Sequence, residues 1–115
     1  MTVPDPSAAP HAEELTWKAV GQAADWPAEG GKLVQVGPRR IGVYRHQGVW
    51  YALKDVCPHA GVSLVKGPVQ NMAVMCVGHG WTFRLDTGEI DRGPGGFSVP
   101  TYPAREREGV VELGF

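Results

Sequence analysis

The chain has 115 residues, a formal net charge of −1 and 43% hydrophobic residues. This length suffices for one compact domain with a hydrophobic core and is too short for two. The balanced charge argues against a nucleic-acid partner, and no apolar run approaches the ~20 residues that cross a bilayer, which argues against a membrane partner.

The N-terminal segment differs in composition from the rest of the chain. Its first 14 residues contain Pro4, Pro6 and Pro10 among small and acidic side chains. Such a segment buries little apolar surface, so we expect a mobile tail over residues 1–14 and a single domain over residues 15–115. It also lacks the basic start and apolar run of a secretory signal peptide. We therefore expect a soluble, cytoplasmic protein whose cysteines stay reduced.

After this segment, short apolar runs alternate with turn residues, which is typical of β-strands. We predict strands over residues 15–20, 32–36, 41–45, 49–53, 73–77, 81–85 and 110–113. No apolar i, i+3, i+4 pattern persists for three turns, so only residues 25–30 are expected to form a single helical turn. Turn residues at 46–48, 86–89 and 106–109 favour reversals between strands. The pattern predicts an all-β fold, either an antiparallel sandwich or a small barrel.

Two segments of the chain each pair a cysteine with a histidine. Cys57 and His59 form a C-x-H motif, Cys76 and His79 form a C-x-x-H motif, and 16 residues separate the two motifs. Each pair is expected in a loop after a strand, so the two loops could close on one inorganic centre from opposite sides. The other two histidines, His11 in the tail and His46 in a turn, are expected to face solvent.

Three interpretations of these pairs compete. The first is coincidence, with two ordinary buried cysteines and two loop histidines. The second is a structural zinc site, which accepts these ligand types but usually spaces them as C-x₂₋₄-C and H-x₃₋₅-H. The third is a [2Fe–2S] cluster with two thiolates on one iron and two imidazoles on the other, where each loop supplies one ligand of each kind. We favour the cluster because both the ligand types and their pairing fit.

The segments Cys57-Pro58-His59-Ala60-Gly61 and Cys76-Val77-Gly78-His79-Gly80-Trp81-Thr82-Phe83 resemble the two ligand boxes of the Rieske family. The resemblance covers about residues 15–113. It implies one Rieske-type [2Fe–2S] cluster, with Cys57 and Cys76 on the inner iron and His59 and His79 on the outer iron. It also implies an antiparallel β-fold with a cluster-binding lobe, and a proline-bearing loop over residues 93–96 that covers the cluster.

The resemblance also bears on the reduction potential. Rieske proteins of cytochrome bc complexes carry an extra cysteine in each loop, where this chain has Val62 and Gly78. They also carry a serine and a tyrosine whose hydroxyls hydrogen-bond the cluster, where this chain has Trp81 and Phe83. Fewer donors to sulfur stabilise the reduced state less, so we expect a potential in the lower part of the Rieske range of about −150 to +300 mV.

Two functions follow from this resemblance. One is a free electron carrier without a catalytic site of its own, which passes electrons from a reductase to a redox enzyme such as an oxygenase. The other is the small subunit of an assimilatory NADH-dependent nitrite reductase, which residues 97–105 and 109–113 resemble. No nucleophile–base pair and no glycine-rich nucleotide loop indicates a further activity.

Overall fold

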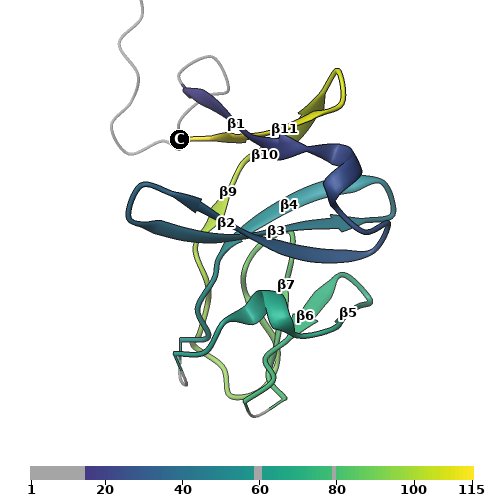
Figure 1. Cartoon of the computed structure of the whole chain (residues 1–115). Coiled ribbons are helices and arrows are strands. Elements are labelled where there is room, and N and C mark those ends of the chain that lie inside the picture. The colour runs from purple at the N-terminus through teal and green to yellow at the C-terminus, as the bar shows by residue number, and fades with distance from the viewer. Residues whose placement is uncertain (1–14, 59–60, 79) are drawn as a thin grey trace, which may run out of the picture.

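The computed structural model describes residues 15–58, 61–78 and 80–115. Within these residues the chain forms eleven strands and two short 3-10 helices, drawn in Figure 1. The strands are β1 (Trp17–Gln22), β2 (Gly30–Val36), β3 (Arg39–His46), β4 (Val49–Lys54), β5 (Val69–Gln70), β6 (Ala73–Met75), β7 (Thr82–Arg84), β8 (Ile90–Arg92), β9 (Thr101–Tyr102), β10 (Ala104–Arg107) and β11 (Val110–Gly114). The 3-10 helices are η2 (Ala23–Asp25) and η3 (Leu64–Lys66).

The strands form three antiparallel sheets with the orders β1-β11-β10, β2-β3-β4-β9 and β5-β6-β7-β8. In Figure 1 the sheet with β2, β3 and β4 lies in the middle, with β1-β11-β10 on one side of it. The third sheet and η3 form a separate lobe on the other side. No helix in the described part of the chain is long and apolar enough to cross a membrane.

The middle sheet separates two hydrophobic cores. The base core consists of Ala23, Trp26, Ile41, Val43, Trp50, Ala52, Val111 and Leu113. The lobe core consists of Tyr44, Leu53, Cys57, Leu64, Val74, Cys76, Phe83, Leu85 and Val99. Because side chains alternate along a strand, Ile41 and Val43 of β3 enter the base core while Tyr44 enters the lobe core. The middle sheet is therefore covered on both faces.

The predicted all-β fold is confirmed, since the structure is built from antiparallel sheets with two short 3-10 helices in its described residues. Each predicted strand overlaps an observed one, but β5, β8, β9 and β10 were not predicted. These four strands have two to four residues and contain no two consecutive apolar residues, so they lack an apolar run that could mark them. The predicted helical turn at 25–30 was misplaced, because the observed turn is Ala23–Asp25.

Two of the predicted reversals are tight hairpins with consecutive positive φ angles. Gln47 and Gly48 have φ values of 50° and 77°, and Glu108 and Gly109 have values of 53° and 81°. Such angles at both central residues match the right-handed twist of the flanking strands. The β3–β4 and β10–β11 connections are therefore determined by local sequence.

The prediction that His46 faces solvent is wrong. Its side chain is buried, at 7% exposure, and its Nδ1 lies 2.6 Å from Oε1 of Glu29. The backbone N–H of Gln47 donates to the other oxygen of Glu29 at 2.6 Å. Glu29 reaches this hairpin because the next residue, Gly30, pairs with Arg45 in the sheet. The predicted tail at 1–14, with His11, lies outside the described residues.

Candidate cluster-binding site

The two cysteines begin loops that close in the same way. After β4, the N–H of Cys57 donates to the carbonyl of Val62 at 2.8 Å, and the N–H of Gly61 donates to the carbonyl of Cys57 at 2.8 Å. The first loop thus returns on itself through two backbone hydrogen bonds that both involve its cysteine.

The second loop repeats this pattern between β6 and β7. The N–H of Cys76 donates to the carbonyl of Trp81 at 2.7 Å, and the N–H of Gly80 donates to the carbonyl of Cys76 at 2.9 Å. The sequence spacing of these bonds equals that in the first loop. The predicted strand over 73–77 therefore ends earlier, at Met75, because Cys76 already belongs to the loop.

A glycine occupies the same place in both loops. Gly61 has a φ of 68° and Gly80 a φ of 78°, a region that glycine adopts without the steric cost of a Cβ atom. Each of these glycines directs its N–H back to the cysteine carbonyl. The glycine four positions after each cysteine is therefore part of the local structure that holds the loop.

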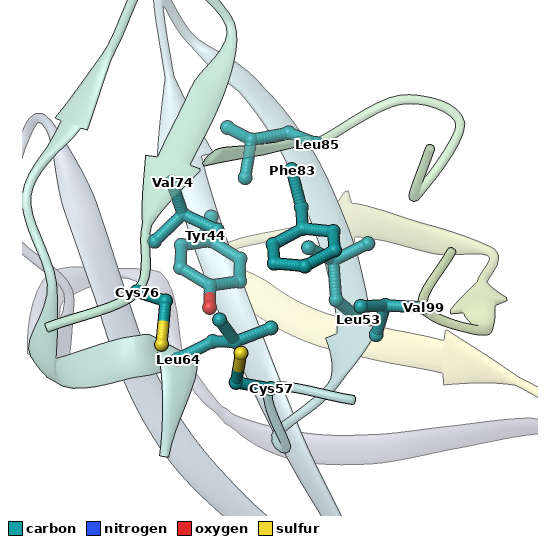
Figure 2. Packing of buried hydrophobic residues seen from close by; sticks show 9 residues of the cluster. All are labelled: Tyr44, Leu53, Cys57, Leu64, Val74, Cys76, Phe83, Leu85 and Val99. Atoms are coloured by element: carbon teal, nitrogen blue, oxygen red, sulfur yellow. The ribbon is translucent and has the colours of Figure 1, made fainter. Parts of the chain in front are cut away.

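The loops bring both cysteine side chains into the lobe core. Cys57 and Cys76 are fully buried, they are not joined by a disulfide, and they pack in one cluster with Tyr44 and Leu64. Figure 2 shows the two sulfur atoms on the same side of this cluster, near the end of the Tyr44 ring that carries the hydroxyl. The structure thus brings together the two predicted thiolate ligands.

The two predicted imidazole ligands, His59 and His79, lie outside the described residues. Among the residues that are described, no group of three or more His, Cys, Asp or Glu side chains could hold a metal ion. The complete ligand set therefore stays a prediction.

Sequence reasoning missed Asp55, which fixes the first loop. Its side chain is 4% exposed; Oδ1 accepts the N–H of Val65 at 2.8 Å, and Oδ2 accepts the hydroxyl of Ser63. Its own N–H donates to the carbonyl of Arg40 at 2.9 Å. Asp55 thus ties the start of the Cys57 loop to the segment that follows it. An acidic residue between the apolar β4 run and the cysteine was the available signal.

Sequence reasoning also missed Tyr44, which lies beside the thiols. Its side chain is fully buried, and its hydroxyl has no hydrogen-bond partner within residues 15–58, 61–78 and 80–115. Burial, and then the negative charge of Asp55, raise the pKa of Tyr44 well above its ordinary value. The phenol is therefore a neutral hydrogen-bond donor.

The predicted covering loop at 93–96 lies near the second cysteine loop. A Cβ atom at Gly93 would lie 3.1 Å from Cγ of Trp81, and the ring of Phe97 packs on Trp81 with centroids 5.0 Å apart. The side chain of Phe97 is itself partly exposed, as are Met75 and Val77. This end of the lobe therefore presents apolar surface to solvent.

These residues fit a [2Fe–2S] group. Two buried thiols from matching loops supply the sulfur ligands of one iron, and a buried hydroxyl beside them is available as a donor to sulfur. Each loop also carries a histidine within three positions of its cysteine in the sequence. The two buried thiols agree with the predicted thiolate ligands, and the imidazole ligands stay a prediction.

Comparison with known proteins supports this fit. The family model of the Rieske [2Fe-2S] domain matches residues 16–103, which include both loops. The ferredoxin CarAc of Metapseudomonas resinovorans is 29% identical over 96 residues, which are 83% of this chain and 90% of that protein. Apoptosis-inducing factor 3 of Mus musculus is 30% identical over 112 residues, but these are 95% of this chain and only 18% of that longer protein.

Two solved structures have a similar fold. A chain in the complex of reduced oxygenase and oxidized ferredoxin of carbazole 1,9a-dioxygenase gives a TM-score of 0.77 at 28% identity, covering 84% of this chain and 91% of that chain. The structure of a protein described as an NADH-dependent nitrite reductase small subunit from Mycobacterium tuberculosis gives a TM-score of 0.80 at 24% identity, covering 88% of this chain and 96% of that chain. The second likeness shows the fold alone. Because the family model spans both cysteine loops, the cofactor is one Rieske-type [2Fe–2S] cluster, and the chain belongs to the Rieske [2Fe–2S] domain family.

Proposed function

We propose that this protein is a soluble one-electron carrier that passes electrons from a reductase to a partner redox enzyme such as an oxygenase. The observation that carries this proposal is the convergence of two identically closed cysteine loops on one buried cluster of side chains. The similarity to a ferredoxin along 90% of that protein's length supports the assignment as a carrier. We further propose residues 15–115 as a single domain, and the cytoplasm as its compartment.

In this proposal Cys57 and Cys76 hold the inner iron as thiolates, and His59 and His79 hold the outer iron as neutral imidazoles. When bound, the cluster takes up and releases one electron. Neutral imidazole contributes less negative charge than thiolate, which favours reduction relative to an all-cysteine cluster.

The other residues of the lobe shield and hold the ligand loops. Leu64 and Phe83 are fully buried in the same cluster as the two thiols and help to exclude water from it. Asp55 and the loop hydrogen bonds maintain the positions of the cysteines. Exposed apolar side chains at the lobe, such as Val77 at 57% exposure, support contact with a redox protein.

A second proposal is the small subunit of an NADH-dependent nitrite reductase. The resemblance of residues 97–105 and 109–113 to that subunit favours it. The two proposals differ in how the partner is held, because a subunit forms a stable complex and a free carrier exchanges between partners. Size-exclusion chromatography with a nitrite reductase large subunit distinguishes them: co-elution supports the subunit, and separate elution supports the carrier.

Spectroscopy of the purified protein tests the cluster assignment. Protein prepared without oxygen is expected to contain two iron and two sulfide per chain and to give a rhombic electron spin resonance signal after reduction. His79→Ala should abolish this signal, whereas His11→Ala, which alters a histidine outside both motifs, should retain it. Iron-loaded protein without the signal, or protein that binds one zinc ion per chain, would contradict the assignment.

Electron transfer is tested by mixing the reduced holoprotein with an oxygenase component that accepts electrons from Rieske ferredoxins. Oxidation of the cluster in a single exponential phase is expected. A cluster that stays reduced in the presence of an active oxygenase and its substrate would exclude the proposed role with that partner class and favour the subunit.

A further inference from the structure

The hydroxyl of Tyr44 is a buried polar group without a partner. The side chain is fully buried, and the oxygen accepts and donates no hydrogen bond within the described ranges 15–58, 61–78 and 80–115. Burial of a hydroxyl without a hydrogen bond costs free energy, because the group loses its bonds to water. A phenylalanine would fill the same space without this cost, so the hydroxyl needs an explanation.

The neighbouring strands provide space specifically for this side chain. A Cβ atom at Gly31 on β2 would lie 2.5 Å from Cδ1 of the Tyr44 ring, and a Cβ atom at Gly42 on β3 would lie 2.8 Å from the Tyr44 hydroxyl oxygen. Glycine usually weakens a strand interior, so its presence at both places indicates that the ring and its hydroxyl must fit here.

The hydroxyl points toward the start of the first cysteine loop. Gly42, which lies beneath it, pairs with Leu53 near the end of β4, and the Cys57 loop follows β4. Figure 2 shows the oxygen at the end of the ring nearest the sulfur atoms of Cys57 and Cys76, and all three residues pack in one cluster.

The carboxylate of Asp55 already accepts hydrogen bonds from two other groups. One of its oxygens accepts the N–H of Val65, and the other accepts the hydroxyl of Ser63. A tyrosine hydroxyl carries its proton at neutral pH, so it can donate a hydrogen bond.

We propose that Tyr44 donates a hydrogen bond to a sulfur on the cysteine-bound side of the [2Fe–2S] cluster and thereby raises its reduction potential. This inference rests on the proposed function. Reduction adds one negative charge to the cluster, so a donor to sulfur stabilises the reduced state more than the oxidised state. Trp81 and Phe83 in the second ligand box have no hydroxyl. Tyr44 supplies a donor from a strand distant in sequence.

The substitution Tyr44→Phe in the holoprotein tests this role. We expect the rhombic signal to remain and the equilibrium constant for reduction to fall about tenfold, which is about 59 mV for one electron. Tyr102→Phe is the matched control, because Tyr102 packs on Phe115 at the base core and should leave the potential unchanged. Both potentials are measured by redox titration followed by electron spin resonance.

Unfolding of the apoprotein provides a second readout. A hydroxyl with a purely structural role would lower the melting temperature when it is removed. If the hydroxyl serves the cluster, apoprotein with Tyr44→Phe should melt at the same or a higher temperature than apoprotein with Tyr44, because no hydrogen bond to a described residue is lost.

A third measurement can be made even if the Tyr44→Phe variant fails to incorporate the cluster. The chain has three tyrosines, so Tyr51→Phe together with Tyr102→Phe leaves Tyr44 as the single tyrosine. Replacement of tyrosine by 3-fluorotyrosine in this background gives a stronger phenol donor, and the potential should rise. A fall or no change would overturn the proposal.

The failures of the two proposals are distinguishable. A normal rhombic signal with the same potential in Tyr44→Phe as in the parent protein overturns the role of Tyr44 and leaves the cluster assignment intact. Absence of that signal from iron-loaded parent protein overturns the proposed function itself, and the Tyr44 role with it.

Discussion

The base core and the lobe core lie on opposite faces of the same sheet, but they differ in whether their buried polar groups are hydrogen-bonded. In the base core Trp26 donates its Nε1–H to the carbonyl of Val43 at 2.9 Å, and Trp50 donates to Glu106 at 3.1 Å. On the lobe side, Tyr44 and Thr82 have buried hydroxyls without a partner in the described residues. The two indole N–H groups of the base core are paired within the protein, whereas in the lobe core the unpaired Tyr44 hydroxyl lies in one cluster with two buried thiols.

This difference predicts that replacing a cysteine removes the cluster but leaves the base core folded. Cys76→Ser should abolish the visible absorption and the rhombic signal, because a serine oxygen is a poor replacement for a thiolate on iron. The strand content measured by circular dichroism should remain. Retention of a normal cluster in Cys76→Ser would remove the basis for the lobe as a cofactor site.

A matched pair of leucines sharpens the comparison. Leu113 in the base core and Leu64 in the lobe core are both fully buried, so either leucine-to-alanine change should reduce the free energy of unfolding by about 2–5 kcal/mol. Only Leu64→Ala should also change the potential, upward, because added water near the cluster stabilises the extra negative charge of the reduced state. Denaturant titration and redox titration measure the two effects; equal potentials in both variants would argue against this difference.

Removal of the buried Asp55 carboxylate in the first loop should lower the free energy of unfolding more than removal of an exposed carboxylate. Asp55→Ala leaves the Val65 N–H and the Ser63 hydroxyl without their acceptor, so a loss of about 1–3 kcal/mol is expected. The control is Asp86→Ala, which breaks an exposed pair with Arg84 and should cost about 0–1 kcal/mol. Hydrogen exchange at the Val65 amide should increase only in the first variant. Unchanged exchange there would show that Asp55 does not hold the loop.

The smallest effect concerns pH and the hairpin at the base. The N–H of Gln47 is the main cause that lowers the pKa of Glu29 below its ordinary value of 4.5, with a further contribution from His46 and partial opposition from desolvation. A lowered pKa in the folded state stabilises the fold above pH 4.5, and this contribution is lost as the pH falls through the lower, folded value. Glu29→Gln should flatten the pH dependence of unfolding in this window. An identical profile in both proteins would contradict the contribution of Glu29.

The ligand motifs and most of the strands could be predicted from sequence because their signals are local. The cysteine and histidine spacing lies within short segments, strand alternation has a period of two, and the turns at Gln47–Gly48 and Glu108–Gly109 depend on adjacent residues. The expected potential in the lower Rieske range stays a prediction, and the Tyr44 donor would place it above the value for a chain without that hydroxyl.

The sequence by itself determined the family, the all-β class and the candidate ligands, since these depend on residue type and short spacing. Only the tertiary structure decided that His46 is buried against Glu29, that Asp55 joins the two sides of a loop, and that the Tyr44 hydroxyl lies beside two thiols. The His46 and Tyr44 contacts join segments from different strands or loops, so their closeness follows from sheet register and packing rather than from a local pattern of residues. The Asp55 contacts lie closer along the chain, and their local signal was a single acidic residue before the cysteine.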